Sequence, residues 1–349
     1  MSIASRSKRL LGRANALNTT RLNALASSSS SRLSPPSARG VIHHQRRTFA
    51  SAQTQYQETG PTHWDQHHRN YSTDANETGD VVELAFEKAE PKDGAGRGKP
   101  VVVLHGLFGQ KQNWRSLSRA MAKSMHTNVY AVDLRNHGTS PHNPRMDYNT
   151  MAADVRHFFK THGLEDVVLI GHSMGGKVAA TLALDPSLPS NTLSSLVIAD
   201  ITPLRFGLST DFAQYLDAMQ EIERQGVKDQ KGAMAIMEQR GLIQHFLLTN
   251  LGGPSPGSNV RKFRIPLDIH SDNLPNAGDF PYAPGEAKYE GRTMVVRGSK
   301  SKYVPDSKLD EFRSFFPNMR LETLDAGHWV HAERPNEFLG IVRDFVKTA

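Results

Sequence analysis

The stretch Asp166-Val-Val-Leu-Ile-Gly-His-Ser-Met-Gly-Gly-Lys177 organises the rest of this chain. Its apolar residues 167–170 predict a short buried strand, and residues 178–184 favour a helix. Between them, Gly171-His-Ser-Met-Gly175 fits the pattern G-x-S-x-G. The two glycines leave room for a sharp turn that holds a serine in a strained backbone conformation. The stretch therefore predicts a strand, a tight turn and a helix, with Ser173 presented at the turn as a nucleophile.

Basic residues are concentrated at the start of the 349-residue chain. Residues 1–50 hold nine of the 42 Lys and Arg residues and no Asp or Glu, which leaves 33 basic against 35 acidic residues elsewhere, so the formal charge of +7 comes from this segment. A basic, Ser-rich and acid-free segment is typical of a mitochondrial transit peptide, and Arg47-Thr-Phe-Ala50 resembles a mitochondrial processing site. We expect residues 1–49 to be a disordered transit peptide that directs the protein to the mitochondrial matrix. A basic tail that binds nucleic acid is the alternative.

The remaining composition excludes several kinds of site. No run approaches the ~18 apolar residues that a spanning helix needs, so no transmembrane segment is expected. The chain has no cysteine, which excludes disulfides, thiol nucleophiles and Cys-ligated zinc. Residues 50–79 are polar and predict a linker, in which His63, His67 and His68 are more simply solvated than bound to a metal. We expect no metal, no cofactor and no nucleic-acid partner.

From residue 80 onward, short apolar segments alternate with segments of helical periodicity. The predicted strands are 81–87, 101–104, 129–132, 167–170, 196–199, 294–296 and 321–324; the predicted helices are 114–125, 151–161, 178–184, 309–316 and 338–347. This alternation predicts an α/β fold with a mostly parallel sheet covered by helices on both faces. Residues 94–99 are Gly-rich but precede a strand, so they predict a hairpin loop and not a phosphate-binding loop.

Residues 203–290, approximately, interrupt this alternation. Apolar residues recur there at helical spacing: Phe212, Tyr215, Leu216, Met219 and Ile222. Residues 234–248 continue the helical character, and 252–257 predict a loop. The length and position of the segment predict a helical cap inserted between two strands of the sheet. Its apolar residues are expected to pack on the main domain, with Phe212 and Met219 as candidates for lining an acyl pocket.

A serine hydroxyl becomes a strong nucleophile only when a base takes its proton and a third group orients that base. His328 is the predicted base, because it follows the last predicted strand on a loop beside Gly327. His331, three residues further on, is its rival. Asp200 is the predicted acid, because it ends strand 196–199 at the sheet edge where open α/β sheets place their sites. Asp306 is the rival acid, although capping the following helix explains it well.

An acyl-transfer site also needs hydrogen-bond donors for the oxyanion of its transition state. The backbone N–H of Met174, directly after the nucleophile, is one predicted donor. The other is the N–H of Leu107, in the turn His105-Gly-Leu-Phe-Gly109 after the first central strand. Residues 133–138 predict a structural turn, although Arg135 or His137 could instead rim the pocket.

Four groups of residues occur in a recognisable order: His105-Gly-Leu-Phe-Gly109 with Asn113-Trp114, Asp133-Leu-Arg-Asn-His-Gly138 with Ser140-Pro-His142, Gly171-His-Ser-Met-Gly-Gly-Lys177, and Gly327-His-Trp-Val-His-Ala-Glu333 with Pro335. Together they resemble the mitochondrial α/β-hydrolase subfamily that contains the fungal ethanol acetyltransferases and the animal mitochondrial abhydrolase-domain protein. The resemblance covers about residues 80–349 and implies the α/β-hydrolase fold. It also implies a Ser-Asp-His triad whose acid follows the strand after the predicted helix 178–184. Ser173, Asp200 and His328 match that triad, which independently favours Asp200 over Asp306.

This chain departs from the subfamily pattern in a longer N-terminal linker and in Pro/Ser-rich loops at 185–192 and 252–258. The second loop lies in the predicted cap, so it bears on substrate specificity. The combined prediction is a mitochondrial serine esterase or thioesterase that acts on a small-molecule ester or acyl-CoA through an acyl-enzyme.

An acetyl-CoA:alcohol acetyltransferase with the same triad is the alternative, and a non-enzymatic binding module is a third. Dehalogenase and epoxide hydrolase chemistry are disfavoured, because those enzymes carry aspartate at the position of Ser173. The sequence does not predict the oligomeric state.

Overall fold

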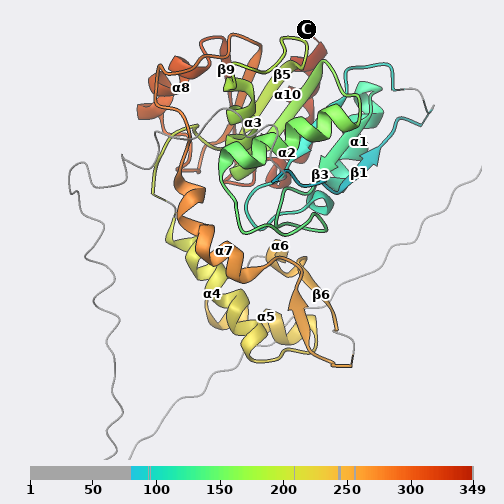
Figure 1. Ribbon diagram of the computed structural model, residues 1–349, viewed down its shortest axis with the longest axis vertical. Helices are drawn as coiled ribbons and strands as arrows, with labels where there is room; N and C mark the ends of the chain where they lie inside the picture. The colour runs from blue at the N-terminus through green and yellow to red at the C-terminus, as the bar shows by residue number, and fades with distance from the viewer. Residues whose placement is uncertain are drawn as a thin grey trace, which may run out of the picture. The chain divides into compact units, whose positions relative to one another are not determined.

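The computed structural model describes residues 80–347 except 93, 95, 208, 243, 244, 255 and 256 (Figure 1). The predicted transit peptide (1–49) and linker (50–79), with the three linker histidines, lie outside the described residues. Those assignments therefore stay predictions.

Within the described residues, seven strands form one sheet in the order β1-β3-β2-β4-β5-β8-β9. The strands are β1 Phe86–Ala89, β2 Val101–Leu104, β3 Val129–Val132, β4 Val167–His172, β5 Leu193–Ala199, β8 Thr293–Gly298 and β9 Met319–Leu324. β1 is antiparallel to β3, and all other neighbouring pairs are parallel. The predicted α/β fold with a mostly parallel sheet is confirmed.

Two local predictions about the first strands are wrong. β1 begins at residue 86, five residues later than expected. Residues 94–99 do not close a hairpin, because β1 pairs with β3, while β2 lies between β3 and β4. β3 and β4 pair with β2 on its two sides, and β3 separates β2 from β1. The chain therefore crosses β3 on its way from β1 to β2. The backbone N–H groups of Arg97 and Gly98 instead donate to the carbonyl oxygen of His126, after the first helix.

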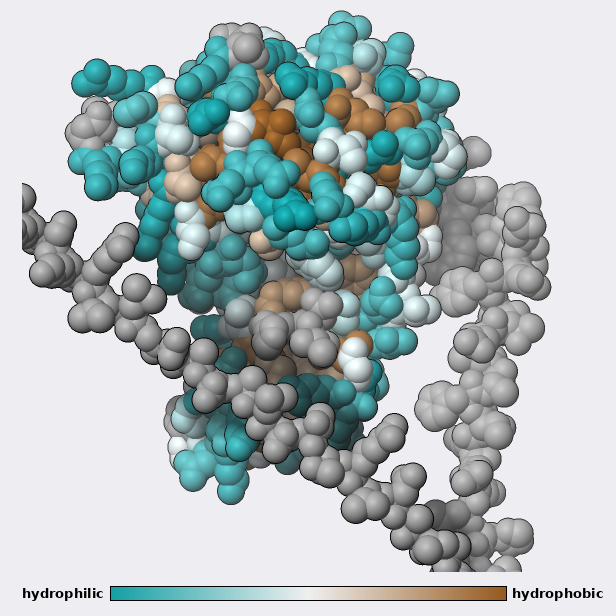
Figure 2. Space-filling view, turned by 180° about the vertical axis from the view of Figure 1, so that it is seen from behind, coloured by the Kyte–Doolittle hydropathy of each residue, from teal (hydrophilic) through white to brown (hydrophobic). Residues whose placement is uncertain are grey.

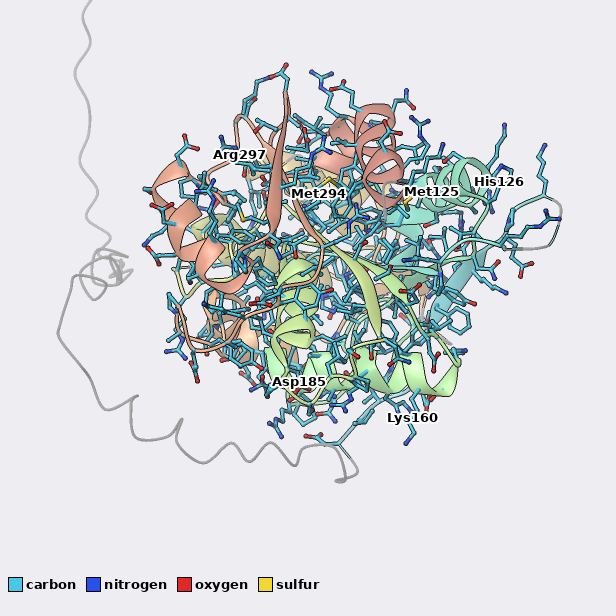
Figure 3. All side chains as sticks on the ribbon, turned by 90° about the horizontal axis from the view of Figure 1, so that it is seen from above. Met125, His126, Lys160, Asp185, Met294 and Arg297 are labelled. Carbon is cyan, nitrogen blue, oxygen red and sulfur yellow. The ribbon has the colours of Figure 1, made fainter. Side chains whose placement is uncertain are left out.

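Helices cover both faces of the sheet, and the central strand divides its side chains between them. In β2, Val101 and Val103 belong to a core with α1 (Arg115–Met125) and α10 (Pro335–Lys347), while Val102 and Leu104 face α2 (Tyr148–Thr161) and α3 (Met174–Leu184). This division follows from the alternation of side chains along a strand. Figure 3 shows the layers from above, with Lys160 and Asp185, at the ends of α2 and α3, on the side opposite α10.

The segment between β5 and β8 forms the predicted insertion (Figure 1). Its elements are α4 Thr210–Arg224, α5 Gln230–Gln239, α6 His245–Leu248, β6 Leu251–Pro254, β7 Arg261–Phe263, α7 Leu267–Asn273 and η5 Leu274–Gly278. The apolar residues of α4 at helical spacing are buried, as expected. The predicted loop at 252–257 is partly wrong, because residues 251–254 pair with β7 in a small antiparallel sheet. We therefore call residues 201–292 the cap.

One buried lysine on the helix after Ser173 contacts two separate parts of the cap. The Nζ of Lys177, on α3, donates to the carbonyl oxygens of Gly278 at 3.1 Å and Asp279 at 2.8 Å. It also lies 4.3 Å from the ring centre of Phe206 at the start of the cap. Because burial removes the hydration of the ammonium group, the pKa of Lys177 falls to about 7.

The remaining elements are short: η4 Lys111–Trp114 before α1, η6 Asp306–Lys308 and α8 Leu309–Phe315 after β8, and α9 Val330–Glu333 before α10. The surface in Figure 2 is largely hydrophilic, with apolar side chains scattered between. Among the described residues, Phe86 is the one large apolar side chain classed as exposed. None of the described helices combines the length and apolar character required to cross a bilayer.

Candidate active site

Ser173 occupies the sharp turn between β4 and α3. Its φ of 53° lies in the left-handed region, which few residues other than glycine adopt. The turn closes tightly because its glycines lack side chains. A Cβ on Gly171 would overlap the backbone of Gly175, and a Cβ on Gly175 would lie 2.5 Å from the carbonyl oxygen of His105 on the neighbouring loop. The strained serine is thus fixed by close packing on both sides, as the sequence predicts.

The imidazole of His328 lies between the Ser173 hydroxyl and the Asp200 carboxylate. Its Nε2 is 3.0 Å from Ser173 Oγ, and its Nδ1 is 2.7 Å from Asp200 Oδ2. Because a carboxylate only accepts hydrogen bonds, Nδ1 carries the hydrogen and Nε2 is left as the acceptor for the serine proton. His328 is 9% exposed, Ser173 7% and Asp200 0%, so the contacts are shielded from bulk water. The structure brings together the three residues selected from the sequence.

The rival base, His331, has a different environment. Its ring stacks flat on Trp114, with centroids 4.0 Å apart and an interplanar angle of 5°. Its Nδ1 is buried without a hydrogen-bond partner among the described residues. Burial, with a smaller contribution from the nearby His328, lowers the pKa of His331 to about 3. These are the features of a core side chain.

The rival acid, Asp306, faces solvent. Its side chain is 80% exposed and accepts from Arg297 at 2.6 Å, at the start of η6. Asp200 lies instead at the carboxyl end of β5, with a φ of 53° that turns the chain sharply after the strand. Asp200, and not Asp306, is the carboxylate that contacts His328.

Two groups that the sequence did not single out also hold Asp200. The backbone N–H of Gly298 donates to Oδ1 at 2.8 Å, and the Ser301 hydroxyl donates to Oδ2. Both come from the loop after β8, where the sequence offers no carboxylate before Asp306. The absence of a carboxylate from this loop could have indicated its role. A buried acid on the neighbouring strand needs hydrogen-bond donors, and the loop beside it is the nearest source.

The loop 105–109 lies against Ser173. A Cβ on Gly106 would be 3.2 Å from the Cβ of Ser173, and the Gly109 N–H donates back to Gly106 O at 2.9 Å. Phe108, in the middle of this turn, has a φ of 59°. Among the hydrogen bonds of the described residues, none uses the N–H of Leu107 or Met174 as a donor. Both amides are therefore free to bind a ligand oxygen.

A pair of buried histidines fixes this loop against the turn after β3. His137 Nε2 accepts the N–H of Phe108 at 3.1 Å, and His137 Nδ1 donates to Arg135 O at 2.8 Å. In the opposite direction, His105 Nε2 accepts the N–H of Leu134 at 3.0 Å. Because each Nε2 accepts a backbone N–H, both rings are neutral, and burial lowers the pKa of His105 and of His137 in the same sense.

Neither Arg135 nor His137 rims a pocket, since both are fully buried. Arg135 forms a two-point ion pair with Asp154, Nε to Oδ2 at 2.6 Å and Nη2 to Oδ1 at 2.8 Å. It also donates to the backbone carbonyls of Arg145 and Asp80. Residues 133–138 thus have the structural role that the sequence favoured.

A cavity of about 220 Å³ opens beside His328, between the cap and the loops after β8 and β9. Its lining residues are Asp211, Phe212 and Tyr215 from α4, Lys300, Ser301, Lys302 and Tyr303, and His328 with Trp329. The Tyr303 ring lies 4.2 Å from the imidazole of His328. Of the two cap residues considered for an acyl pocket, Phe212 lines the cavity, while Met219 is fully buried in the core. No group of three or more His, Asp or Glu side chains in the described part of the chain is placed to hold a metal ion.

A family model described as the alpha/beta hydrolase fold matches residues 99–335. The chain belongs to the α/β-hydrolase family. The sn-1-specific diacylglycerol lipase ABHD11 of Xenopus tropicalis is 36% identical over 278 residues, which cover 77% of this α/β-hydrolase and 83% of that protein. A probable alcohol acetyltransferase of Saccharomyces cerevisiae is 36% identical over 267 residues, covering 71% and 77% of the two chains.

Among solved structures, a marine microorganism esterase superposes with a TM-score of 0.67 at 29% identity, covering 76% of this α/β-hydrolase and all of the esterase. The animal and yeast relatives confirm the predicted subfamily. The chain is an ester-acting hydrolase by family.

Proposed function

We propose that this α/β-hydrolase is a mitochondrial serine hydrolase that cleaves short-chain carboxylic esters or thioesters. The observation that carries the proposal is the imidazole of His328, 3.0 Å from the Ser173 hydroxyl and 2.7 Å from Asp200. As Ser173 Oγ attacks the substrate carbonyl, His328 Nε2 takes its proton. Asp200 keeps the ring in the required tautomer and stabilises the imidazolium that forms.

The oxygen of the attacked carbonyl becomes an oxyanion, and the N–H groups of Leu107 and Met174 stabilise it. The support for this assignment is their lack of other acceptors in the described residues and the contact of Gly106 with Ser173. Loss of one such donor in comparable enzymes raises the barrier by about 3–4 kcal/mol. Fixed backbone amides suit this task, because they need no reorganisation as the charge develops.

The tetrahedral intermediate collapses when the bond to the leaving group breaks. The imidazolium returns its proton to the departing alcohol or thiol, and the acyl group remains on Ser173 Oγ as an ester. A water molecule then attacks this ester while His328 accepts its proton. When this second tetrahedral intermediate collapses, the imidazolium returns the proton to Ser173 Oγ and the carboxylic acid is released. The free enzyme is restored, so no cofactor is consumed.

The size of the cavity supports a small acyl group. Its volume of about 220 Å³ is below the roughly 300–1,000 Å³ usual for pockets that enclose drug-sized ligands. Aromatic side chains of Phe212, Tyr215 and Trp329 supply an apolar lining. We therefore expect acetyl and butyryl esters to be better substrates than octanoyl and longer esters.

The proposal is tested with the full-length chain and p-nitrophenyl esters of increasing acyl length. Ser173→Ala should abolish hydrolysis, and a fluorophosphonate probe should label the wild-type chain at Ser173 alone. Ser299→Ala, on an exposed loop serine, is the matched control and should retain full activity. Turnover that persists in Ser173→Ala would refute the mechanism.

Alcoholysis of the same acyl-enzyme is the second candidate, and the similarity to the probable yeast alcohol acetyltransferase favours it. In this case ethanol, in place of water, attacks the acyl-serine and leaves as ethyl acetate. Incubation with acetyl-CoA and increasing ethanol, followed by quantification of ethyl acetate and free acetate, separates the two. A ratio of ethyl acetate to free acetate that rises with the ethanol concentration supports transfer. Formation of acetate without ethyl acetate supports hydrolysis.

The mitochondrial location is tested independently of catalysis. Residues 1–49 fused to a fluorescent reporter should direct it to mitochondria, and the mature chain should begin at Ala50. A reporter that remains in the cytosol would contradict the proposed location and leave the chemistry unaffected.

A further inference from the structure

The loop after β8 reaches the buried carboxylate at the end of β5. Of the two oxygens of Asp200, Oδ1 accepts the Gly298 N–H at 2.8 Å, and Oδ2 accepts both the Ser301 hydroxyl and His328 Nδ1–H, the latter at 2.7 Å. The Ser301 hydroxyl and the imidazole therefore share one carboxylate oxygen. Asp200 is fully buried, so no bulk water replaces a donor that is lost.

The direction of the Ser301 hydroxyl is fixed by its own surroundings. Its Oγ accepts the backbone N–H of Tyr303 at 3.3 Å, and the Ser301 N–H closes a turn onto Gly298 O at 3.1 Å. Because Oγ receives a hydrogen from one side, its own hydrogen points to the carboxylate, which can only accept. The serine is thus built into the loop as a donor to Asp200.

We propose that Ser301 is a positioning residue for the reaction, acting through Asp200 on His328; the inference rests on the triad of the proposed function. With the Gly298 N–H on Oδ1 and the Ser301 hydroxyl on Oδ2, the carboxylate cannot rotate away from the imidazole. The hydroxyl also draws part of the negative charge of Oδ2, and so moderates how strongly Asp200 attracts the imidazolium. Ser301 therefore controls both the orientation of the base and the pH range in which it works.

The chain contains a matched control for this role. Ser299 lies two residues earlier on the same loop, is exposed, and its Oγ is 3.4 Å from Asp325 instead of near Asp200. Ser301→Ala and Ser299→Ala remove the same hydroxyl group from neighbouring positions. A general effect on loop stability would appear in both, whereas a positioning effect would appear in Ser301→Ala alone.

The test measures kcat and KM from pH 5 to 9 for the full-length wild type and for Ser301→Ala, Ser301→Thr and Ser299→Ala. For Ser301→Ala we expect kcat to fall about tenfold, the effect of one hydrogen bond of roughly 1.4 kcal/mol, with KM within twofold of the wild type. The midpoint of the acidic limb of the kcat/KM profile should rise by about half a pH unit, because a carboxylate with one donor fewer attracts the imidazolium more strongly. Ser301→Thr, which keeps the hydroxyl, should restore the wild-type profile, and Ser299→Ala should not differ from wild type.

The inference is overturned if the acidic limb of Ser301→Ala coincides with that of the wild type, or if Ser299→Ala moves it equally. If Ser301→Ala folds poorly, the proton NMR signal of the imidazole Nδ1–H in its folded fraction is compared with that of Ser301→Thr. An unchanged signal refutes the role of Ser301. Ser173→Ala, measured alongside, separates the two claims. If Ser173→Ala is inactive and the pH profile of Ser301→Ala equals that of the wild type, only the inference about Ser301 is refuted. If Ser173→Ala retains activity, the proposed function is refuted.

Discussion

Gly298 at the end of β8 and Gly327 on the loop before His328 lie in direct contact. A Cβ on Gly298 would overlap the carbonyl oxygen of Gly327 and would lie 2.5 Å from that of Ala326. The same Gly298 donates its N–H to Asp200. The absence of a side chain at one position therefore lets the acid and the loop of the base approach each other.

Gly298→Ala should displace the His328 loop, because the new methyl group meets backbone that cannot rotate aside. We expect a loss of unfolding free energy of about 1–3 kcal/mol, typical of overpacking. We also expect kcat to fall by about 100-fold, since a shift of about 1 Å at a catalytic group has effects of this size. Gly340→Ala, on α10 with no atom near the added Cβ, is the control and should be neutral or slightly stabilising. Near-normal kcat in Gly298→Ala would contradict the packing argument.

His331→Phe should retain kcat/KM within about threefold, because His331 stacks on Trp114 and does not contact Ser173. It should also change the response to acid. The pKa of His331 is lowered to about 3 in the folded chain, so from its ordinary value of 6.5 down to about 3 the unfolded chain binds more protons and the wild type loses stability as pH falls. Urea unfolding at pH 7.5 and pH 5 should show that the unfolding free energy of His331→Phe, relative to that of the wild type, is higher at pH 5 than at pH 7.5. An equal difference at both pH values, or loss of activity, would contradict this account.

Lys177→Met should flatten the pH dependence of stability above neutrality. Since the pKa of Lys177 is lowered to about 7 in the folded chain, the unfolded chain binds more protons between about pH 7 and its ordinary pKa of 10.5. Wild-type stability should therefore rise between pH 7 and pH 9 through this group, on the order of 2 kcal/mol. Lys177→Met lacks this rise.

The measurement is urea unfolding at pH 7, 8 and 9, with Lys160→Met as the control. Lys160 is an exposed lysine near the end of α2 (Figure 3), so its removal should leave the wild-type slope unchanged. Parallel pH curves for Lys177→Met and wild type would show that the buried ammonium does not contribute.

Asp154→Asn should destabilise the chain by about 3–5 kcal/mol, the effect of leaving one member of a buried ion pair without its partner. The pair is fully enclosed, and Asp154 also accepts the N–H of Val82 at 3.0 Å. Because the pair supports the 133–138 turn and not the reacting atoms, kcat of the folded fraction should stay within about twofold. Thermal unfolding and activity per folded molecule, measured on the same sample, check both parts. A stable variant with reduced kcat would place Asp154 closer to the chemistry than its contacts indicate.

Most of the sheet was predictable because its central strands are short, continuous apolar runs. Such runs can only be buried on both faces, and the intervening helical periodicities supply the covering layers. The predictions were wrong where the structure depends on which strands pair with each other. Residues 94–99 resemble a hairpin locally, yet β2 already has β3 and β4 as neighbours. Residues 251–254 contain two glycines and a proline, and they form a strand only because β7 lies alongside.

The sequence by itself determined the strained turn at Ser173, since the glycines around it specify a local backbone geometry. It also determined that His328 and Asp200 follow strands at one edge of a parallel sheet. Only the tertiary structure decided that His331 packs on Trp114, that Asp306 faces solvent, and that Ser301 donates to Asp200. Those outcomes depend on contacts between residues distant in the chain. The local sequence pattern does not specify which distant side chains come into contact when the sheet and helices pack together.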